Sequence, residues 1–141
     1  MKRDYPEAPI VGVGVVCLRG DAVLLIRRGK PPREGAWSLP GGRQKLGETV
    51  RDCAARELGE ETGIEAEIGG LVDVVDSLTR DGDNRVQYHY TLVDFAARWR
   101  HGEPRPGGDA ADARWFAPGE LAALDLWSET IRVIDAARRL T

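Results

Sequence analysis

The chain has 141 residues, about the length of one ordinary domain. Hydrophobic residues make up 42% and charged residues 30%, which indicates a water-soluble globular protein and excludes a disordered or fibrous chain. The net charge of -3 excludes the general attraction to nucleic acid or anionic lipid that a strongly basic domain has. We therefore predict neither a nucleic-acid nor a membrane partner, and any phosphate binding must be local.

Two cysteines, Cys17 and Cys53, each lie inside an apolar run, and their spacing supports neither a zinc site nor a redox pair. We expect both to be reduced and buried. The first residues carry charge but no apolar core of a signal peptide, and no stretch approaches the length of a membrane span. The cytoplasm is the expected compartment.

The first half of the chain predicts a β-hairpin, a basic loop, a short extended piece and a helix. In chain order these are strands over 10–18 and 22–26, a loop over 27–35, an extended piece over 36–39 that Pro40 and two glycines end, and a helix over 49–61. Gly63 lies just beyond the end of this helix and is a typical helix stop. The spacing of Val50, Cys53, Ala54 and Leu58 gives the helix its apolar face.

The second half predicts further strands and a final helix. In chain order these are two strand pieces within 64–78, divided at Gly69-Gly70, a turn over 81–84, a strand over 86–96, a loop over 101–109, a short strand at 115–116, helical turns over 118–124 and an amphipathic helix over 128–140. We expect Ile131, Ile134, Ala137 and Leu140 to face the sheet, and we favour core packing for Tyr88 and Tyr90 over a place in a nucleoside pocket.

Three carboxylates, Glu57, Glu60 and Glu61, lie three and four positions apart in the predicted helix, so they should emerge as one cluster. They also lie in the last turn, where the helix dipole disfavours acids. Hard oxygen ligands at this density suit Mg²⁺ or Mn²⁺. The pattern therefore predicts a metal site.

Further residues around this helix support such a site. Glu48 and Arg56 flank the first turns and could form an ion pair that braces the preceding loop. Gly41 and Gly42 have no side chain, so their backbone can approach a ligand closely. The carbonyl group of Gly42 could then join the metal ligands.

These residues together resemble the signature of a known family, the Nudix hydrolases. The match consists of Gly42, Glu48, Arg56-Glu57-Leu58, Glu60-Glu61 and Gly63-Ile64 at the spacing of the complete Nudix box. Flanking segments 37–42 and 112–116 also resemble the family, so the likeness covers most of the chain. It implies an α/β fold, a Nudix-type α/β/α sandwich with a mixed central sheet, and one Nudix hydrolase domain over residues 1–141.

The resemblance implies hydrolysis of a nucleoside diphosphate linked to another group, by water attacking phosphorus with Mg²⁺ bound, Mn²⁺ being an alternative. The implied metal ligands are Gly42, Glu57, Glu60 and Glu61. The implied catalytic set is Glu57, Glu60, Arg56 and Glu48, with either Glu57 or Glu60 as the base that activates water. A homodimer is compatible with the family.

The implied substrate is a small nucleotide, and its candidate binding residues are Arg27, Arg28, Gly41 and Asp112. Exposed arginines are often only soluble surface, and Asp109 is an alternative to Asp112 as a further acidic residue. ADP-ribose or a nucleoside diphosphate sugar is the first substrate hypothesis. A nucleoside triphosphate pyrophosphohydrolase and a non-catalytic nucleotide sensor are the alternatives.

Overall fold

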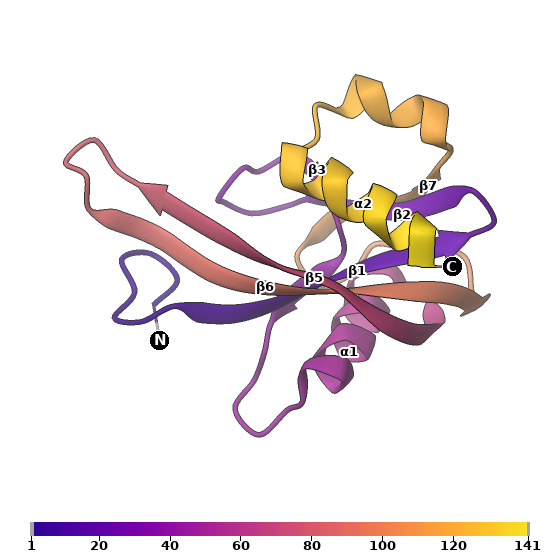
Figure 1. Cartoon of the computed structure of the whole chain (residues 1–141), viewed down its shortest axis with the longest axis horizontal. Helices are drawn as coiled ribbons and strands as arrows, with labels where there is room; N and C mark the ends of the chain where they lie inside the picture. Colours follow the sequence, from indigo (N-terminus) through magenta and orange to yellow (C-terminus); the bar gives the residue numbers. More distant parts are fainter. Residues whose placement is uncertain (1, 141) are drawn as a thin grey trace.

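The computed structural model of the chain describes residues 2–140 and has a seven-stranded sheet with two α-helices (Figure 1). In chain order the elements are β1 (Ile10–Arg19), β2 (Ala22–Arg28), β3 (Trp37–Ser38), β4 (Gly41–Arg43), α1 (Val50–Thr62), β5 (Glu65–Arg80), β6 (Val86–His101), β7 (Ala110–Phe116), the 3-10 helix η1 (Pro118–Leu124) and α2 (Ser128–Leu140). β1 and β6 pair in parallel, while the other strand pairs are antiparallel. The predicted mixed sheet is therefore confirmed.

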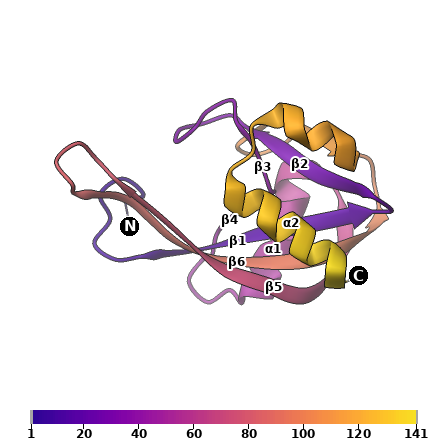
Figure 2. The same ribbon diagram turned by 45° about the horizontal axis from the view of Figure 1, so that its top comes forward.

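The two α-helices cover opposite faces of the sheet, as Figures 1 and 2 show. Side chains alternate along β1, so Val15 and Cys17 pack in the apolar cluster under α1, while Val16 and Leu18 pack in the cluster under α2. Cys53, Leu58 and Ile64 complete the first cluster, and Val133, Ile134 and Ala137 complete the second. This arrangement confirms the predicted α/β/α sandwich.

The sheet opens between β1 and β2, and this opening positions the functional region. The two strands pair at their turn, where Leu18 lies opposite Val23. Further along, β4 pairs with residues Gly12 to Gly14 of β1, and β3 pairs with β2. A Cβ atom at Gly41 would overlap the carbonyl oxygen of Val13, so only glycine allows this close approach of β4.

Several predicted boundaries are wrong because tertiary pairing extends the strands: the strand predicted over 86–96 continues to His101, and the short strand predicted at 115–116 begins at Ala110. Arg27 and Arg28 belong to β2, since β7 pairs with them, and do not lie in a loop. Gly69-Gly70 does not divide a strand: β5 runs continuously, and its register with β6 shifts between Ile68 and Leu71. The glycines thus produce an irregularity in one long strand rather than a break.

The predicted helix over 49–61 is confirmed, since the side chain of Thr49 caps α1 and Gly63 ends it with a φ of 70°. In α2 the buried stripe consists of Thr130, Val133, Ile134 and Ala137. The inward positions predicted for Ile131 and Leu140 are wrong, because these side chains lie on the exposed side of that stripe. Both cysteines are reduced and buried, as predicted.

No helix within residues 2–140 is long and apolar enough to cross a membrane.

Candidate active site

A cavity of about 550 Å³ joins the C-terminal part of α1 to the face of the sheet that α2 covers. At the α1 end it is lined by Gly41, Gly42, Glu57, Glu60 and Glu61. At the other end it is lined by Val75, Tyr90, Leu92, Asp94 and Trp127. The rim carries cationic side chains, among them Arg28, Lys30 and Arg56. Acidic groups, cations and aromatic rings therefore surround one space large enough for a nucleotide.

Glu61 is the most deeply buried acid at the α1 end, with only 7% of its surface exposed. Its Oε1 accepts a hydrogen bond of 2.7 Å from the backbone N–H of Gly41. Burial raises the pKa of Glu61 to about 7, although this hydrogen bond acts in the opposite direction. The side chain therefore exchanges its proton near neutral pH.

Glu57 lies one helical turn before Glu61, and its carboxyl group lies against Gly42. A Cβ atom at Gly42 would come within 2.5 Å of the carboxyl carbon of Glu57, so the absence of a side chain leaves space for this group. Burial raises the pKa of Glu57, and the neighbouring Arg56 lowers it in part. A buried carboxylate, that of Glu61, and a half-buried one, that of Glu57, consequently share one end of the cavity with a glycine backbone.

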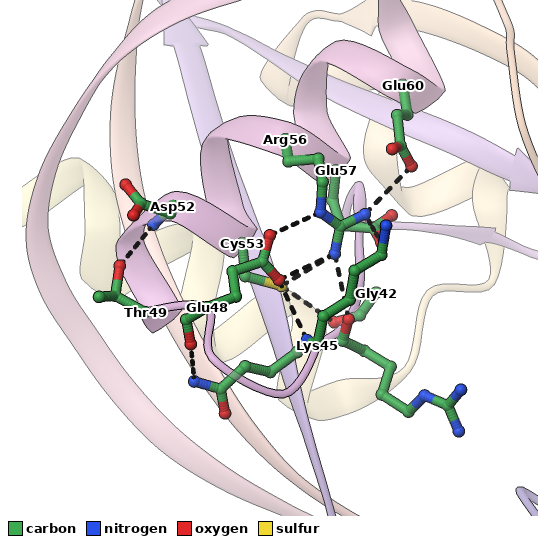
Figure 3. Close-up of polar contacts among 11 residues, drawn as sticks. Gly42, Lys45, Glu48, Thr49, Asp52, Cys53, Arg56, Glu57 and Glu60 are labelled. Atoms are coloured by element: carbon green, nitrogen blue, oxygen red, sulfur yellow. Dashed lines mark hydrogen bonds and ion pairs between the residues drawn. The ribbon is translucent and has the colours of Figure 1, made fainter. Parts of the chain in front are cut away.

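Arg56 connects the acids of this region, as Figure 3 shows. Its Nε and Nη2 donate to the two carboxylate oxygens of Glu48 at 2.6 and 3.0 Å, which confirms the predicted ion pair. Its Nη1 donates to Glu57 at 2.9 Å and to Glu60 at 3.2 Å. These bonds lower the pKa of Glu48 to about 2. Glu48 thus orients Arg56, which in turn orients Glu57.

The three glutamates do not form the single compact cluster that their spacing predicts. The side chain of Glu60 is 51% exposed and turns toward Arg56, whereas Glu57 is half-buried and Glu61 is buried. Within residues 2–140, no three acidic, histidine or cysteine side chains form a ready-made metal site. Nη1 of Arg56 donates to both Glu57 and Glu60, whereas Glu61 receives its hydrogen bond from Gly41.

The donor chemistry nevertheless fits a divalent cation. Glu61 is buried and Glu57 half-buried. The charge of Glu57 raises the pKa of Glu61, and the charges of Glu60 and Glu48 raise the pKa of Glu57, so a cation would relieve the repulsion among these acids. Carboxylate and backbone carbonyl oxygens are the ligands that Mg²⁺ takes in proteins.

The structure separates the four candidate substrate-binding residues into two pairs. Arg28 and Gly41 line the cavity, but Arg27 and Asp112 do not. Side chains alternate along β2, so Arg27 points away from the face on which Arg28 lies, and Asp112 is the register partner of Arg27 in β7. Asp109, the alternative acid, does line the cavity and pairs with Lys30 at 3.0 Å.

Sequence patterns do not reveal the part of the cavity on the α2 side of the sheet. Tyr90 lines the cavity instead of packing only in the core, and Asp94 and Trp127 line it as well. One signal could have identified Asp94: it is the acidic residue within the otherwise uncharged predicted strand over 86–96.

Comparisons with known proteins agree with this geometry. The family model described as NUDIX domain matches residues 8–137. An ADP-ribose pyrophosphatase of Methanocaldococcus jannaschii is 33% identical over 87% of this chain and 70% of the relative. A Mycobacterium tuberculosis protein named "Putative 8-oxo-dGTP diphosphatase 2" is 37% identical over 93% of this chain and 89% of the relative.

A solved structure extends the comparison to the fold. The crystal structure of a MutT NUDIX hydrolase from Burkholderia pseudomallei matches with a TM-score of 0.78 and 32% identity, covering 92% of this chain and 98% of that chain. Together with the family match over most of the sequence, this likeness settles the classification. The chain belongs to the Nudix hydrolase family.

Proposed function

We propose that the protein is a Mg²⁺-dependent pyrophosphohydrolase that cleaves the diphosphate of a nucleoside diphosphate linked to another group. The observation that carries this proposal is the pair of carboxylates, the buried Glu61 and the half-buried Glu57, beside the glycine backbone at one end of the cavity. Cations on the rim give a diphosphate further favourable contacts. Arg28 is the rim arginine that we assign to the substrate.

In this proposal Glu57, Glu60, Glu61 and the carbonyl group of Gly42 hold the metal, with Mn²⁺ as an alternative. A bound divalent ion screens the charge of the diphosphate and makes a water molecule more acidic. Glu57 or Glu60 accepts the proton of the attacking water. Glu48 and Arg56 are positioning residues, because they reach Glu57 and Glu60 through hydrogen bonds.

ADP-ribose and nucleoside diphosphate sugars are the first substrates to test, since the M. jannaschii relative is named for ADP-ribose. Nucleoside triphosphates are the second candidate class, supported by the name of the M. tuberculosis relative. Both classes contain a nucleoside diphosphate, which the cavity would hold with its phosphates toward α1. The cytoplasmic location and the homodimer stay predictions.

A nucleotide sensor without activity is the rival in a different functional class. Such a protein would have no need for two acids beside a glycine backbone, whereas the half-buried Glu57 and the buried Glu61 are both present here. The rival predicts tight nucleotide binding with no product formed.

The test is a panel of ADP-ribose, nucleoside diphosphate sugars, (d)NTPs and dinucleoside polyphosphates, incubated with Mg²⁺ and scored for released monophosphate, phosphate or pyrophosphate. We expect turnover of at least one class that stops in EDTA and returns with added Mg²⁺. Glu65→Gln is the matched control for carboxylate variants, because Glu65 is exposed on β5 outside the cavity. A panel without any turnover, together with tight nucleotide binding, would favour the sensor.

A further inference from the structure

Asp94 is a buried carboxylate without a hydrogen-bond donor at the end of the cavity opposite α1. It lies on β6, only 4% of its surface is exposed, and it lines the cavity. Within residues 2–140 no group donates a hydrogen bond to its side chain or forms an ion pair with it. Burying an acid in this way is costly unless a partner is supplied. A bound ligand can supply that partner.

The backbone opposite Asp94 leaves space for its carboxylate. Gly14 lies beside Asp94 in the parallel pairing of β1 and β6. A Cβ atom at Gly14 would overlap Oδ1 of Asp94, and Leu39 would be its next neighbour. A glycine in the middle of this buried strand therefore keeps the carboxylate in its place beside the cavity.

Neighbouring charges do not satisfy Asp94. Asp73 is its register partner on β5, and the arginine whose charge acts on Asp94, Arg132 of α2, donates to Asp73 at 2.8 Å and to Glu129 at 2.7 Å. Arg132 is thus engaged by other acids. Burial raises the pKa of Asp94 to about 6, so the group is ionised above neutral pH and accepts hydrogen bonds only.

We propose that Asp94 is a specificity-determining residue that accepts two hydrogen bonds from a guanine base, one from N1–H and one from the 2-amino group. The inference rests on the proposed function, because it places the nucleoside of that substrate at the α2 end of the cavity. A carboxylate has two acceptor oxygens side by side. Among the common bases, only guanine presents two adjacent donors, whereas adenine and cytosine place an acceptor nitrogen beside their amino group.

The walls around Asp94 suit a flat base. Tyr90 and Leu92 precede it at alternate positions of β6, so all three side chains lie on one face of the strand. Val75 of β5 and Trp127, just before α2, line the same part of the cavity. Aromatic and aliphatic side chains can contact the two faces of a base, while a carboxylate at the edge of the base accepts hydrogen bonds from its N–H groups.

The test is a binding measurement that needs no catalysis. The α,β-methylene analogues of GDP, IDP and ADP, which cannot be cleaved between the phosphates, are titrated into the protein at pH 8 with Mg²⁺ by calorimetry. IDP lacks only the 2-amino group. We expect GDP to bind about 10-fold to 100-fold tighter than IDP or ADP, the range of a hydrogen bond to a charged group.

Asp94→Asn should reduce this preference to about 3-fold or less, because an amide offers only one acceptor oxygen. The control is Asp76→Asn, the same chemical change at an exposed site of β5 outside the cavity, which should keep the preference. Gly14→Ala is a second route to the same loss, because the added methyl group would displace the carboxylate of Asp94 while Asp94 itself is retained.

The outcomes separate the two proposals. Equal affinity of the wild-type protein for the three analogues, or an unchanged preference in both Asp94→Asn and Gly14→Ala, overturns the role of Asp94 even where the substrate panel is hydrolysed. A guanine preference that depends on Asp94 supports it even where no substrate is cleaved. GDP-mannose, dGTP and 8-oxo-dGTP all keep both donors. Comparing their rates of hydrolysis then shows whether the guanine nucleotide is a nucleoside diphosphate sugar or a nucleoside triphosphate.

Discussion

At the α1 end of the cavity, Glu57 receives a hydrogen bond from Arg56 and Glu61 receives one from Gly41. At the α2 end, Asp94 receives none from the described residues. The two ends therefore differ in how the protein treats a buried acid. Acids held by donors within the protein are fixed in position, as a metal site requires, while an acid without a donor remains available to a ligand.

The largest expected effect concerns the α1 end. Glu61→Gln removes a charge but keeps the volume, so we expect kcat to fall about 100-fold to 1000-fold, the typical cost of losing one electrostatic group of an active site. Glu60→Gln should act in the same direction. Steady-state kinetics at saturating Mg²⁺ measure this, with Glu65→Gln as the control. Near-normal rates would contradict the assignment of the α1 end as the reaction site.

The second prediction concerns the stability cost of the unpartnered acid. The folded pKa of Asp94 is about 6, above the 3.8 of an ordinary aspartate, so between pH 4 and 6 the folded state holds a proton that the unfolded state has released. The free energy of unfolding consequently falls as the pH rises through this window. Above pH 6 the full cost is present, about 3 kcal/mol at 1.36 kcal/mol for each unit of pKa.

Asp94→Asn should therefore raise the free energy of unfolding at pH 8 by up to about 3 kcal/mol and leave it nearly unchanged at pH 4. Chemical denaturation at both pH values measures the difference. Asp76→Asn serves as the exposed control and should change little at either pH. A variant that is destabilised at pH 8 would show that the carboxylate has a partner in the folded protein.

The two ends of the cavity also differ in how far they can be predicted from the sequence. The helix with Glu57 and Glu61, its glycine end and the Glu48–Arg56 pair follow from local spacing within one segment, so they could be predicted. The face that carries Asp94 is assembled from β1, β5, β6 and the start of α2, which lie far apart in the chain. No pattern within either segment indicates that Gly14 and Asp94 are neighbours, because their contact depends on the pairing of β1 with β6.

The dependence on strand pairing also explains the errors in the predicted substrate-binding residues. The composition of the basic segment 27–35 predicts one loop, in which Arg27 and Arg28 are equivalent. Pairing with β7 turns both into strand residues with opposite orientations, and only Arg28 reaches the cavity. The orientation of Glu60 could not be predicted either, because its spacing from Arg56 and from Glu57 permits contact with both.

The third prediction tests the positioning role of Arg56. Arg56→Lys keeps a positive charge but loses the paired donors that hold Glu48, so Glu57 should lose its fixed orientation. We expect kcat/KM to fall about 10-fold to 100-fold and the affinity for Mg²⁺ to weaken. Arg51→Lys, on the exposed side of the same helix, is the control. An unchanged metal affinity with slower turnover would instead place Arg56 on the substrate.

The fourth prediction concerns pH and the metal. A proton and a cation compete for Glu61, whose pKa is about 7 in the metal-free protein. Affinity for the ion should therefore weaken as the pH falls below 7, by about tenfold for each pH unit. Titration with Mn²⁺ at pH 8 and at pH 6 measures this, and Glu61→Gln should remove the dependence. Equal affinities at the two pH values in the wild-type protein would exclude Glu61 as a ligand.

The smallest expected effect separates two adjacent arginines. Arg28 lines the cavity, and its Nε donates to the carbonyl oxygen of Pro32 at 2.7 Å, whereas Arg27 projects from the other face toward the ring of Trp37. Arg28→Ala should raise KM about 5-fold with little change in kcat, since a partly exposed charge contributes about 1 kcal/mol to binding a phosphate. Arg27→Ala should change KM less than about 2-fold. Because the two residues are neighbours with the same side chain, equal effects would mean that general positive charge, rather than the alternation of β2, attracts the substrate.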